Sequence, residues 1–198
     1  MVLASLSVPG MERNIAMLDR LGIPMLVLAP TSLADIRADI ARVGQVLQLE
    51  NEASAVVAEM EMREYAFSVR RDRPVRVYLE WWPKPMFSPG ATCWSNELIA
   101  LAGGENVFRH MPGQSNEITT QQVVEADPEV ILISWCGVPY EKLDPENVLK
   151  RDGIDGVSAI QKRRVYPIDE SLLGRPGPRV LDGVARMEEA MSGLRRTV

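Results

Sequence analysis

The stretch "TTQQVVEADPEVILISW", residues 119–135, shows the architecture of this chain most clearly. Its first half, "TTQQVVEADP", is predicted to be a helix, and "EVILISW" is a strongly apolar strand. A strand that is apolar along its whole length is typically buried on both faces, as parallel strands are when helices cover them. The stretch therefore indicates an α/β fold with a parallel sheet.

The same alternation of apolar and amphipathic segments continues on both sides of this stretch. Short apolar runs favour strands, and apolar residues that recur at helical spacing favour helices. After residue 73 we expect strands at 75–82 and 164–169 and helices at 94–104 and 175–191. Before residue 51 we expect strands at 2–5 and 23–30, a helix at 11–22, and a second helix that starts at the capping pair Thr31-Ser32.

A long helical segment separates these two sets. From Glu52 to Arg71 no glycine or proline interrupts the chain, and apolar residues such as Val56 and Met60 recur near helical spacing. A linker made of loops would show glycines and polar residues instead. The sequence therefore predicts a partial N-terminal α/β lobe at 1–50, a connecting helix at 51–73 and a C-terminal α/β lobe at 74–198.

The composition is that of a globular protein, with 46% of the 198 residues hydrophobic and 25% charged. The net charge of −5 and the absence of long lysine or arginine runs argue against nucleic acid as a partner. Cys93 and Cys136 form no CxxC motif, so they are either free thiols or one disulfide. The sequence shows no signal peptide and no membrane-spanning segment, and the chain as written is expected in the cytoplasm.

The residues just after each strand are where a ligand is expected, because open α/β sheets bind ligands beyond the carboxyl ends of their strands. One such segment, "VYLEWWPKPMFSPG" (77–90), carries Trp81, Trp82 and Phe87, and another carries Trp135. Each tryptophan taken alone is as well explained by packing inside the protein. Their recurrence at the ends of two strands favours a broad, flat, partly apolar ligand.

The sequence features of an enzyme are weak. His110 is the only histidine, and its pairing with Cys136 as base and nucleophile lacks an orienting third group. A metal site of His110 and Glu117 lacks spaced partners, although His110 remains a candidate axial ligand to a metal held by a macrocycle. The glycines of "AGGEN" end a helix instead of opening one, which argues against a nucleotide cofactor. We expect a protein without catalytic residues, catalytic cofactor or protein-built metal site.

Four segments together resemble a known family: "WSNELIALAGGENVF" (94–108), "ITTQQVVEADPEVILIS" (118–134), "LDRLGIPMLVLAPTSLADI" (18–36) and "RPGPRVLDG" (175–183). They are similar to the cobalamin-binding and iron-chelate-binding proteins of ABC importers, which are periplasmic binding proteins with a helical backbone. The likeness extends over nearly the whole chain. It implies two α/β lobes with a ligand cleft between them, and a periplasmic location.

The resemblance implies a substrate-binding protein that captures a corrinoid, such as cobalamin, for import. Aromatic side chains would stack on the ligand, and polar ones would bind its substituents. A haem or a ferric siderophore is the alternative ligand, with its anionic groups on Arg175 and Arg179 and its iron on His110 or Tyr140. The predicted ligand-binding residues are Trp81, Trp82, Phe87, Ser88, His110, Trp135, Tyr140 and Arg175.

Compared with the family, the N-terminal lobe is incomplete, because two further strands and helices would precede Val2. A lobe with two strands buries little surface and leaves an open strand edge, so we expect self-association through this lobe. The resemblance implies an ABC permease as partner, but Gln121 stands where the family has a docking glutamate, which weakens this expectation. The remaining alternatives are a truncated cytoplasmic relative that acts as a non-transport interaction module, and an enzyme that reuses the fold.

Overall fold

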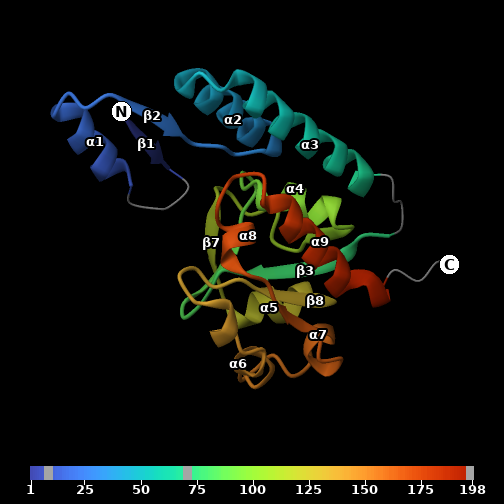
Figure 1. Ribbon diagram of the computed structural model, residues 1–198. Coiled ribbons are helices and arrows are strands. Elements are labelled where there is room, and N and C mark those ends of the chain that lie inside the picture. Colours follow the sequence, from blue (N-terminus) through green and yellow to red (C-terminus); the bar gives the residue numbers. More distant parts are fainter. Residues whose placement is uncertain (7–10, 69–72, 195–198) are drawn as a thin grey trace.

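The computed structural model describes residues 1–6, 11–68 and 73–194, and it shows a mixed α/β chain with two parts of unequal size (Figure 1). The larger part is a C-terminal lobe around a four-stranded sheet. The smaller part holds a two-stranded sheet and one helix, and a pair of long helices links it to the C-terminal lobe. The predicted α/β class is confirmed.

The sheet of the C-terminal lobe has four parallel strands in the order β6-β3-β8-β9. The central strands are β3 (Val75–Glu80) and β8 (Val130–Ile133), and the outer strands are β6 (Gly104–Asn106) and β9 (Val165–Pro167). The chain runs from β3 to the outer strand β6 and then crosses back to β8. The direction in which strands are added therefore reverses between β3 and β8.

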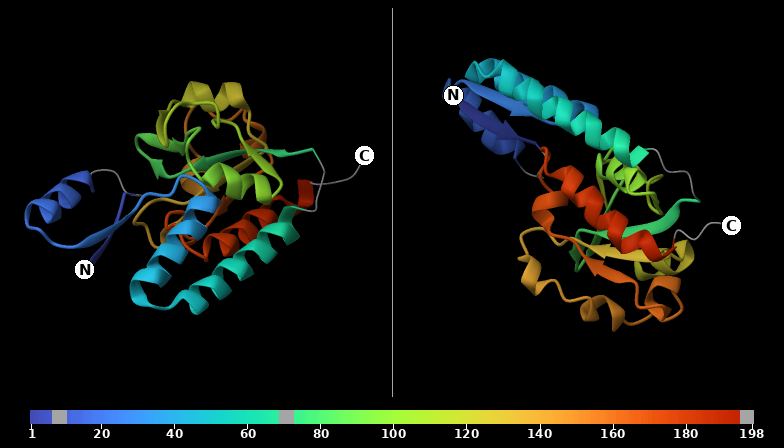
Figure 2. Two further views of the ribbon diagram at one scale, coloured as in Figure 1. Left: turned by 90° about the horizontal axis from the view of Figure 1, so that it is seen from above. Right: turned by 45° about the vertical axis from the view of Figure 1, so that its right-hand side comes forward.

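Helices cover both faces of this sheet (Figures 1 and 2). On one face lie α4 (Ser95–Leu101) and α9 (Val180–Met191). On the other face lie α5 (Thr120–Ala126), α6 (Glu146–Leu149) and α7 (Ser158–Gln161). This arrangement explains why "EVILISW" is apolar along its whole length, since a strand covered on both sides has no solvent face.

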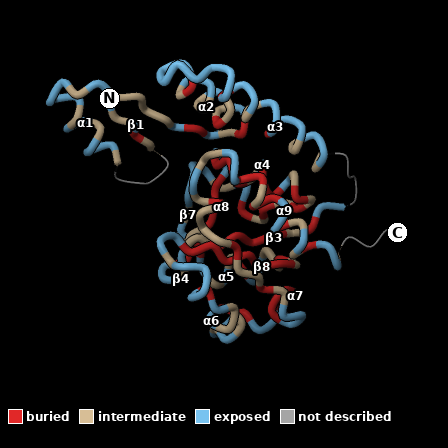
Figure 3. Tube along the Cα trace, viewed as in Figure 1, coloured by how far each residue is buried: buried red, intermediate tan, exposed pale blue. Residues whose placement is uncertain are grey.

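The two faces of the sheet have separate cores. Val77 and Leu79 pack into the core beside α4 and α9, whereas Tyr78 packs into the core on the α5 face. All three side chains are fully buried, and Figure 3 shows buried backbone throughout the centre of this lobe. Because neighbouring strand residues point to opposite faces, the side chain of Glu80 points to the same face as that of Tyr78.

A second, antiparallel sheet begins where β3 ends. It consists of β4 (Trp82–Pro83), β5 (Met86–Pro89) and β7 (Ser115–Ile118). The sequence predicted one strand through residue 82 and then a loop, and this prediction was wrong. The backbone N–H of Trp81 donates to the carbonyl of Phe87 at 2.8 Å, so the chain turns back as a hairpin directly after β3.

Short helices complete the C-terminal lobe. α8 (Glu170–Leu173) follows β9 and packs against α9. Two 3-10 helices, η1 (Tyr140–Lys142) and η2 (Ser192–Leu194), follow β8 and α9 respectively.

A pair of helices, α2 (Leu33–Leu47) and α3 (Glu50–Ser68), packs side by side across the C-terminal lobe (Figure 2). Ser32 caps α2 with a capping box, as the sequence predicted. The predicted connecting helix is confirmed through residue 68, and its last predicted residues lie outside the described part. Ile36 of α2 and Met60 of α3 belong to the same core as α4 and α9. The helix pair is therefore anchored on the C-terminal lobe.

The N-terminal part is thinly packed. Its parallel strands β1 (Val2–Ser5) and β2 (Met25–Leu28) pair in register, and α1 (Glu12–Arg20) connects them. α1 has no buried residue, and Ala4 is the buried residue of the two strands. Figure 3 shows this part projecting from the C-terminal lobe with mostly exposed or half-buried backbone.

Candidate ligand-binding site

The carboxyl ends of β3 and β8 meet at the point where the strand order reverses. The backbone N–H of Ser134 donates to the carbonyl of Glu80 at 2.9 Å, and that of Cys136 donates to the carbonyl of Trp81 at 3.0 Å. Strand pairing thus continues past both strand ends and places Trp81 beside Cys136. In open α/β sheets, ligands bind in the crevice at this switch point. We call Trp81, Trp82, Phe87, Cys136, Glu170 and Arg175 the rim.

The β4–β5 hairpin places three aromatic residues at the rim. Trp82 pairs with Phe87 across the hairpin, while Trp81 points to the opposite face and packs against the core beside α9. Trp81 and Phe87 are half-buried, and Trp82 is 41% exposed. The indole N–H of Trp82 donates to the carbonyl of Lys84 at 3.1 Å. The hairpin region therefore carries three of the predicted residues, with Trp82 and Phe87 on one face and Trp81 on the other.

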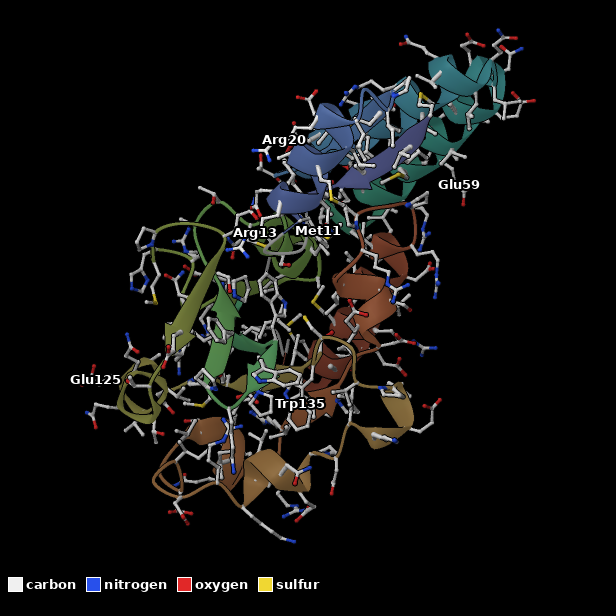
Figure 4. All side chains as sticks on the ribbon, turned by 90° about the vertical axis from the view of Figure 1, so that its left-hand side faces the viewer. Met11, Arg13, Arg20, Glu59, Glu125 and Trp135 are labelled. Atoms are coloured by element: carbon white, nitrogen blue, oxygen red, sulfur yellow. The ribbon has the colours of Figure 1, made fainter. Side chains whose placement is uncertain are left out.

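Trp135 lies deeper than these residues. It is 6% exposed and packs in the core on the α5 face, and Figure 4 shows it among the side chains of the C-terminal lobe, far from the labelled residues of α1. Its indole N–H donates to Glu80 Oε1 at 3.0 Å. The ring therefore forms part of the layer beneath the rim, and its hydrogen-bond donor is already used.

The polar groups of the rim come from the segment after β9. Arg175 Nη2 lies 3.6 Å from Glu170 Oε2, and its side chain is 75% exposed. Asp169 caps α8, and the backbone N–H of Ser171 lowers the pKa of this carboxyl. Burial, and then the negative charge of Glu170, raise the pKa of the Cys136 thiol. Cys136 is therefore a neutral thiol at pH 7 and carries no charge toward a ligand.

The other three predicted ligand-binding residues, Ser88, Tyr140 and His110, differ in burial and surroundings. Ser88 is fully buried in β5, and its hydroxyl makes no hydrogen bond within the described part of the chain. Tyr140 is 49% exposed in η1. His110 is exposed and lines a separate surface pocket of about 570 Å³ together with Arg76, Arg109 and Ala126. The structure therefore does not bring His110 to the rim.

The structure describes both cysteines and most of the side chains that could bind a metal ion. Both Cys93 and Cys136 are free, which resolves the choice left open by the sequence. Across residues 1–6, 11–68 and 73–194, no group of three or more His, Cys, Asp or Glu side chains is arranged to hold a metal ion. The helices in this same part of the chain are all too short or too polar to cross a membrane.

Sequence reasoning missed the asparagine network beside the rim. Asn106, in the "GGEN" motif, is buried and donates to the Pro89 carbonyl at 3.0 Å and to Asn96 Oδ1 at 2.9 Å. Asn96 in turn donates to the carbonyl of Gly90 at 2.8 Å. These bonds tie the end of β5 to β6 and α4. The motif thus holds the hairpin in place, and only its glycines had been interpreted from the sequence.

Sequence reasoning also missed Glu80 and its partner. Glu80 is fully buried, and Arg151 binds it with two hydrogen bonds of 2.6 and 2.9 Å. A glutamate at the end of an apolar run such as "VRVYLE" was the available signal, because a buried carboxylate requires a charged or hydrogen-bonding partner. The sequence could not show that the partner lies beyond α6.

Comparison with known proteins agrees with the fold. Residues 2–172 match the family described as periplasmic binding protein. The uncharacterized ABC transporter substrate-binding lipoprotein YvrC of Bacillus subtilis (strain 168) is 25% identical over 166 residues, which cover 81% of this chain and 51% of that protein. The vitamin B12-binding protein of Yersinia pestis (strain Pestoides F) is 24% identical over 191 residues, which cover 92% of this chain and 62% of that protein.

Solved structures share the fold. The periplasmic heme-binding protein RhuT from Roseiflexus sp. RS-1, in its apo form, matches with a TM-score of 0.82 and 21% identity, over 98% of this chain and 76% of that chain. The chain thus spans 51% and 62% of the length of the two curated relatives. The match over residues 2–172 shows that the chain belongs to the periplasmic binding protein family.

Proposed function

We propose that this chain binds a metal chelate, with a corrinoid as the first candidate, as the substrate-binding protein of an ABC importer. The observation that carries the proposal is the group of partly exposed aromatic side chains at the switch point between β3 and β8. Aromatic rings bury large areas at a low cost in conformational entropy, which suits a flat macrocycle. The relatives named as vitamin B12-binding and heme-binding proteins support this class of ligand.

In this proposal the rim binds mainly by shape and stacking. Trp81, Trp82 and Phe87 contact the apolar faces and edges of the ligand. Trp135 supports them from below, because its ring is buried and its N–H is bonded to Glu80. Ser88 would need the hairpin to open before its buried hydroxyl could reach a ligand.

The alternative ligand, a haem or a ferric siderophore, depends on the basic residues near α8. Arg175 is largely exposed, and Arg179 Nη2 lies 3.2 Å from the Ser171 hydroxyl, so both guanidinium groups can reach anionic substituents. Tyr140 is exposed and remains a candidate iron ligand. A role for His110 as iron ligand would require the ligand to occupy the pocket beside Arg76.

The test is a titration of the purified chain with cyanocobalamin and, separately, with haemin, followed by absorbance and tryptophan fluorescence. We expect one of the two to bind, and Trp82→Ala to weaken its binding about tenfold at unchanged stability, since this ring is exposed. Val124→Ala, at an exposed apolar position on α5, is the matched control and should leave binding unchanged. Absence of a spectral response to both compounds would refute the proposal.

Transport and location follow from the family as proposals. We expect the chain to work outside the cytoplasmic membrane and to deliver its ligand to an ABC permease, without catalysing a reaction. Gln121 lies on α5, where its side chain donates to Glu125 at 2.8 Å, and it offers no negative charge for docking. Reconstitution with a candidate permease, with Gln121→Glu as a gain-of-affinity variant, tests the docking site.

We also propose that the N-terminal part associates with a second copy, which would suit a non-transport interaction module. Among its described residues, this part exposes four large apolar side chains, those of Met1, Leu3, Met17 and Leu21. β1 is uncharged and borders a two-stranded sheet, which is the kind of edge that pairs with another strand. Size-exclusion chromatography with light scattering should show a dimer that Leu3→Lys converts to a monomer. A monomer of the unmodified chain at high concentration would contradict it.

A further inference from the structure

The most connected side chain of the C-terminal lobe is a buried carboxylate directly beneath the rim. Glu80 is 0% exposed and accepts four hydrogen bonds. Tyr78 Oη donates to it at 2.9 Å and Trp135 Nε1 at 3.0 Å. Arg151 donates twice, at 2.6 and 2.9 Å. A single carboxylate therefore holds together three separate segments of the chain.

Each of these segments leads to the rim. Glu80 precedes Trp81, whose backbone bonds both Phe87 and Cys136. Trp135 precedes Cys136. Arg151 follows α6 and also places its Nη1 2.7 Å from Met86 Sδ in the hairpin strand β5. Movement of the Glu80 side chain would therefore be transmitted to both strands and to the hairpin.

If Glu80 and Arg151 served only to stabilise the fold, burying their charges would carry an unnecessary cost in desolvation free energy. Removing two charges from water is expensive, and replacing a buried ion pair by uncharged side chains of similar volume is often neutral or stabilising. An apolar pair at these positions would pack well against the neighbouring core residues Ile133 and Val148. An apolar pair would not fix the orientation of the Trp135 ring, because this orientation depends on the hydrogen bond from its N–H to Glu80.

We propose that Glu80 is a positioning residue for ligand capture: its bonds to Trp135 and Arg151 fix the height and angle at which Trp81 and the β4–β5 hairpin meet the ligand. This inference rests on the function proposed above. It explains why the N–H groups of Trp135 and Arg151 point into the protein. The hydrogen bonds to Glu80 then fix the positions of the stacking rings before the ligand arrives. The rings therefore need not rearrange when it binds.

The test uses a variant that removes the ion pair but keeps one acceptor oxygen for the Trp135 N–H, while the Tyr78 hydroxyl can accept from the new amide group. Glu80→Gln with Arg151→Met preserves the side-chain volumes and leaves no unpaired charge. We expect this double variant to stay folded, with a urea midpoint close to that of the unmodified chain. Its affinity for the compound that binds, cyanocobalamin or haemin, should fall about tenfold. Trp135→Phe removes only the N–H donor, and we expect it to weaken binding in the same way.

The matched control is the ion pair at the other end of the same sheet. Arg73 binds Glu129 with two hydrogen bonds of 3.0 and 2.7 Å at the start of β3. Glu129→Gln with Arg73→Met makes the same chemical change far from the rim and should leave ligand affinity unchanged. Folded Glu80 and Trp135 variants that bind as tightly as the unmodified chain would overturn the proposal, and so would an equal loss in the control.

A readout without ligand separates this inference from the proposed function. Cys136 is the exposed thiol at the rim, whereas Cys93 is buried, so a thiol reagent reports selectively on the rim. The reaction rate of Cys136 should change about threefold or more in the Glu80→Gln, Arg151→Met variant and stay constant in the control. If the unmodified chain binds neither compound, the proposed function fails, and this rate still decides whether Glu80 holds the rim. An unchanged rate overturns the inference.

Discussion

The two parallel sheets of this molecule show opposite degrees of packing. The sheet of the C-terminal lobe is covered on both faces, and every residue of β8 is fully buried. The sheet of the N-terminal part has two strands, and α1 beside it has no buried residue. The rim belongs to the first sheet, so the surface proposed to meet the ligand rests on the rigid part of the molecule.

The helix pair α2–α3 decides how the two parts are connected. It shares a core with the C-terminal lobe, and Arg63 of α3 forms an ion pair with Asp182 of α9 at 2.6 Å. The backbone N–H of Leu33 also donates to Glu97 of α4 at 2.8 Å. The helices therefore move with the C-terminal lobe, and the N-terminal part is the element free to adapt to a ligand or a partner.

The largest expected effect comes from the buried ion pair beneath the rim, compared with an exposed ion pair on α9 of the same lobe. Arg151→Met leaves the Glu80 carboxylate buried without its partner, which should lower the free energy of unfolding by about 3–5 kcal/mol. Arg186→Met removes an ion pair in which both side chains are mostly exposed, and it should cost less than about 1 kcal/mol. Urea denaturation of both variants measures the contrast. Equal effects would mean that the charge of Glu80 reaches water after all.

A pair of strand leucines compares the two sheets directly. Leu132→Ala in β8 deletes a fully buried side chain and should cost about 2–5 kcal/mol. Leu3→Ala in β1 alters a side chain that is 51% exposed and should cost about 0.5 kcal/mol or less. Thermal and urea unfolding provide both values. A large loss for Leu3→Ala would show that the N-terminal sheet is covered in solution, as self-association predicts, and dilution should then reduce the loss.

Among the strands that the sequence predicted, β3 and β8 are those whose apolar residues enter both cores. β3 and β8 are apolar runs, and a chain segment of this kind has few alternatives to burial in a sheet. The outer strand β6 and the antiparallel strand β7 contain "GEN" and "SNEI", which carry no strand signal. They become strands because β3 and β5 offer them hydrogen-bond partners, and local sequence does not record that.

The sequence predicted that the tryptophans lie at strand ends, but it did not predict the orientation of their side chains. The order of strands and helices in the sequence indicates where the strands end. The tryptophans follow the ends of β3 and β8. Whether a ring faces a ligand or a core depends on partners far away in sequence. Trp135 is bonded to Glu80, and Glu80 to Arg151, so its burial follows from contacts over 55 and 71 positions.

A third contrast compares a glycine in the core beside α4 with a glycine at the surface. A Cβ added at Gly104 would lie 2.8 Å from Val77 Cγ2 and 3.0 Å from Ile99 Cγ2, in the packed face beside α4. Gly104→Ala should therefore cost about 1–3 kcal/mol through overpacking. Gly156→Ala is the control, because no atom lies within 4 Å of the added Cβ. Its free energy of unfolding should be unchanged or slightly higher, and an equal loss at both positions would contradict the packing argument.

The smallest expected effect is the pH dependence of a surface ion pair. The hydrogen bond from Arg73 is the main cause that lowers the pKa of Glu129 below its usual value of 4.5. A carboxylate with a lowered pKa in the folded state contributes stability above its unfolded pKa, and loses this contribution as the pH falls through the folded-state value. Because Arg73 is 65% exposed, Glu129→Gln should cost less than about 1 kcal/mol at pH 7.

This cost should shrink as the pH falls below the usual glutamate range, since protonation removes the same charge from the unmodified chain. Urea denaturation between about pH 7 and pH 3 follows it, and Arg73→Gln should show the same dependence because it breaks the same pair. A loss that persists unchanged at the acidic end would assign the effect to the bond between Glu129 and the backbone N–H of Arg76. The start of β3 would then be held by a neutral contact, in contrast to its other end, where the charge of Glu80 is buried.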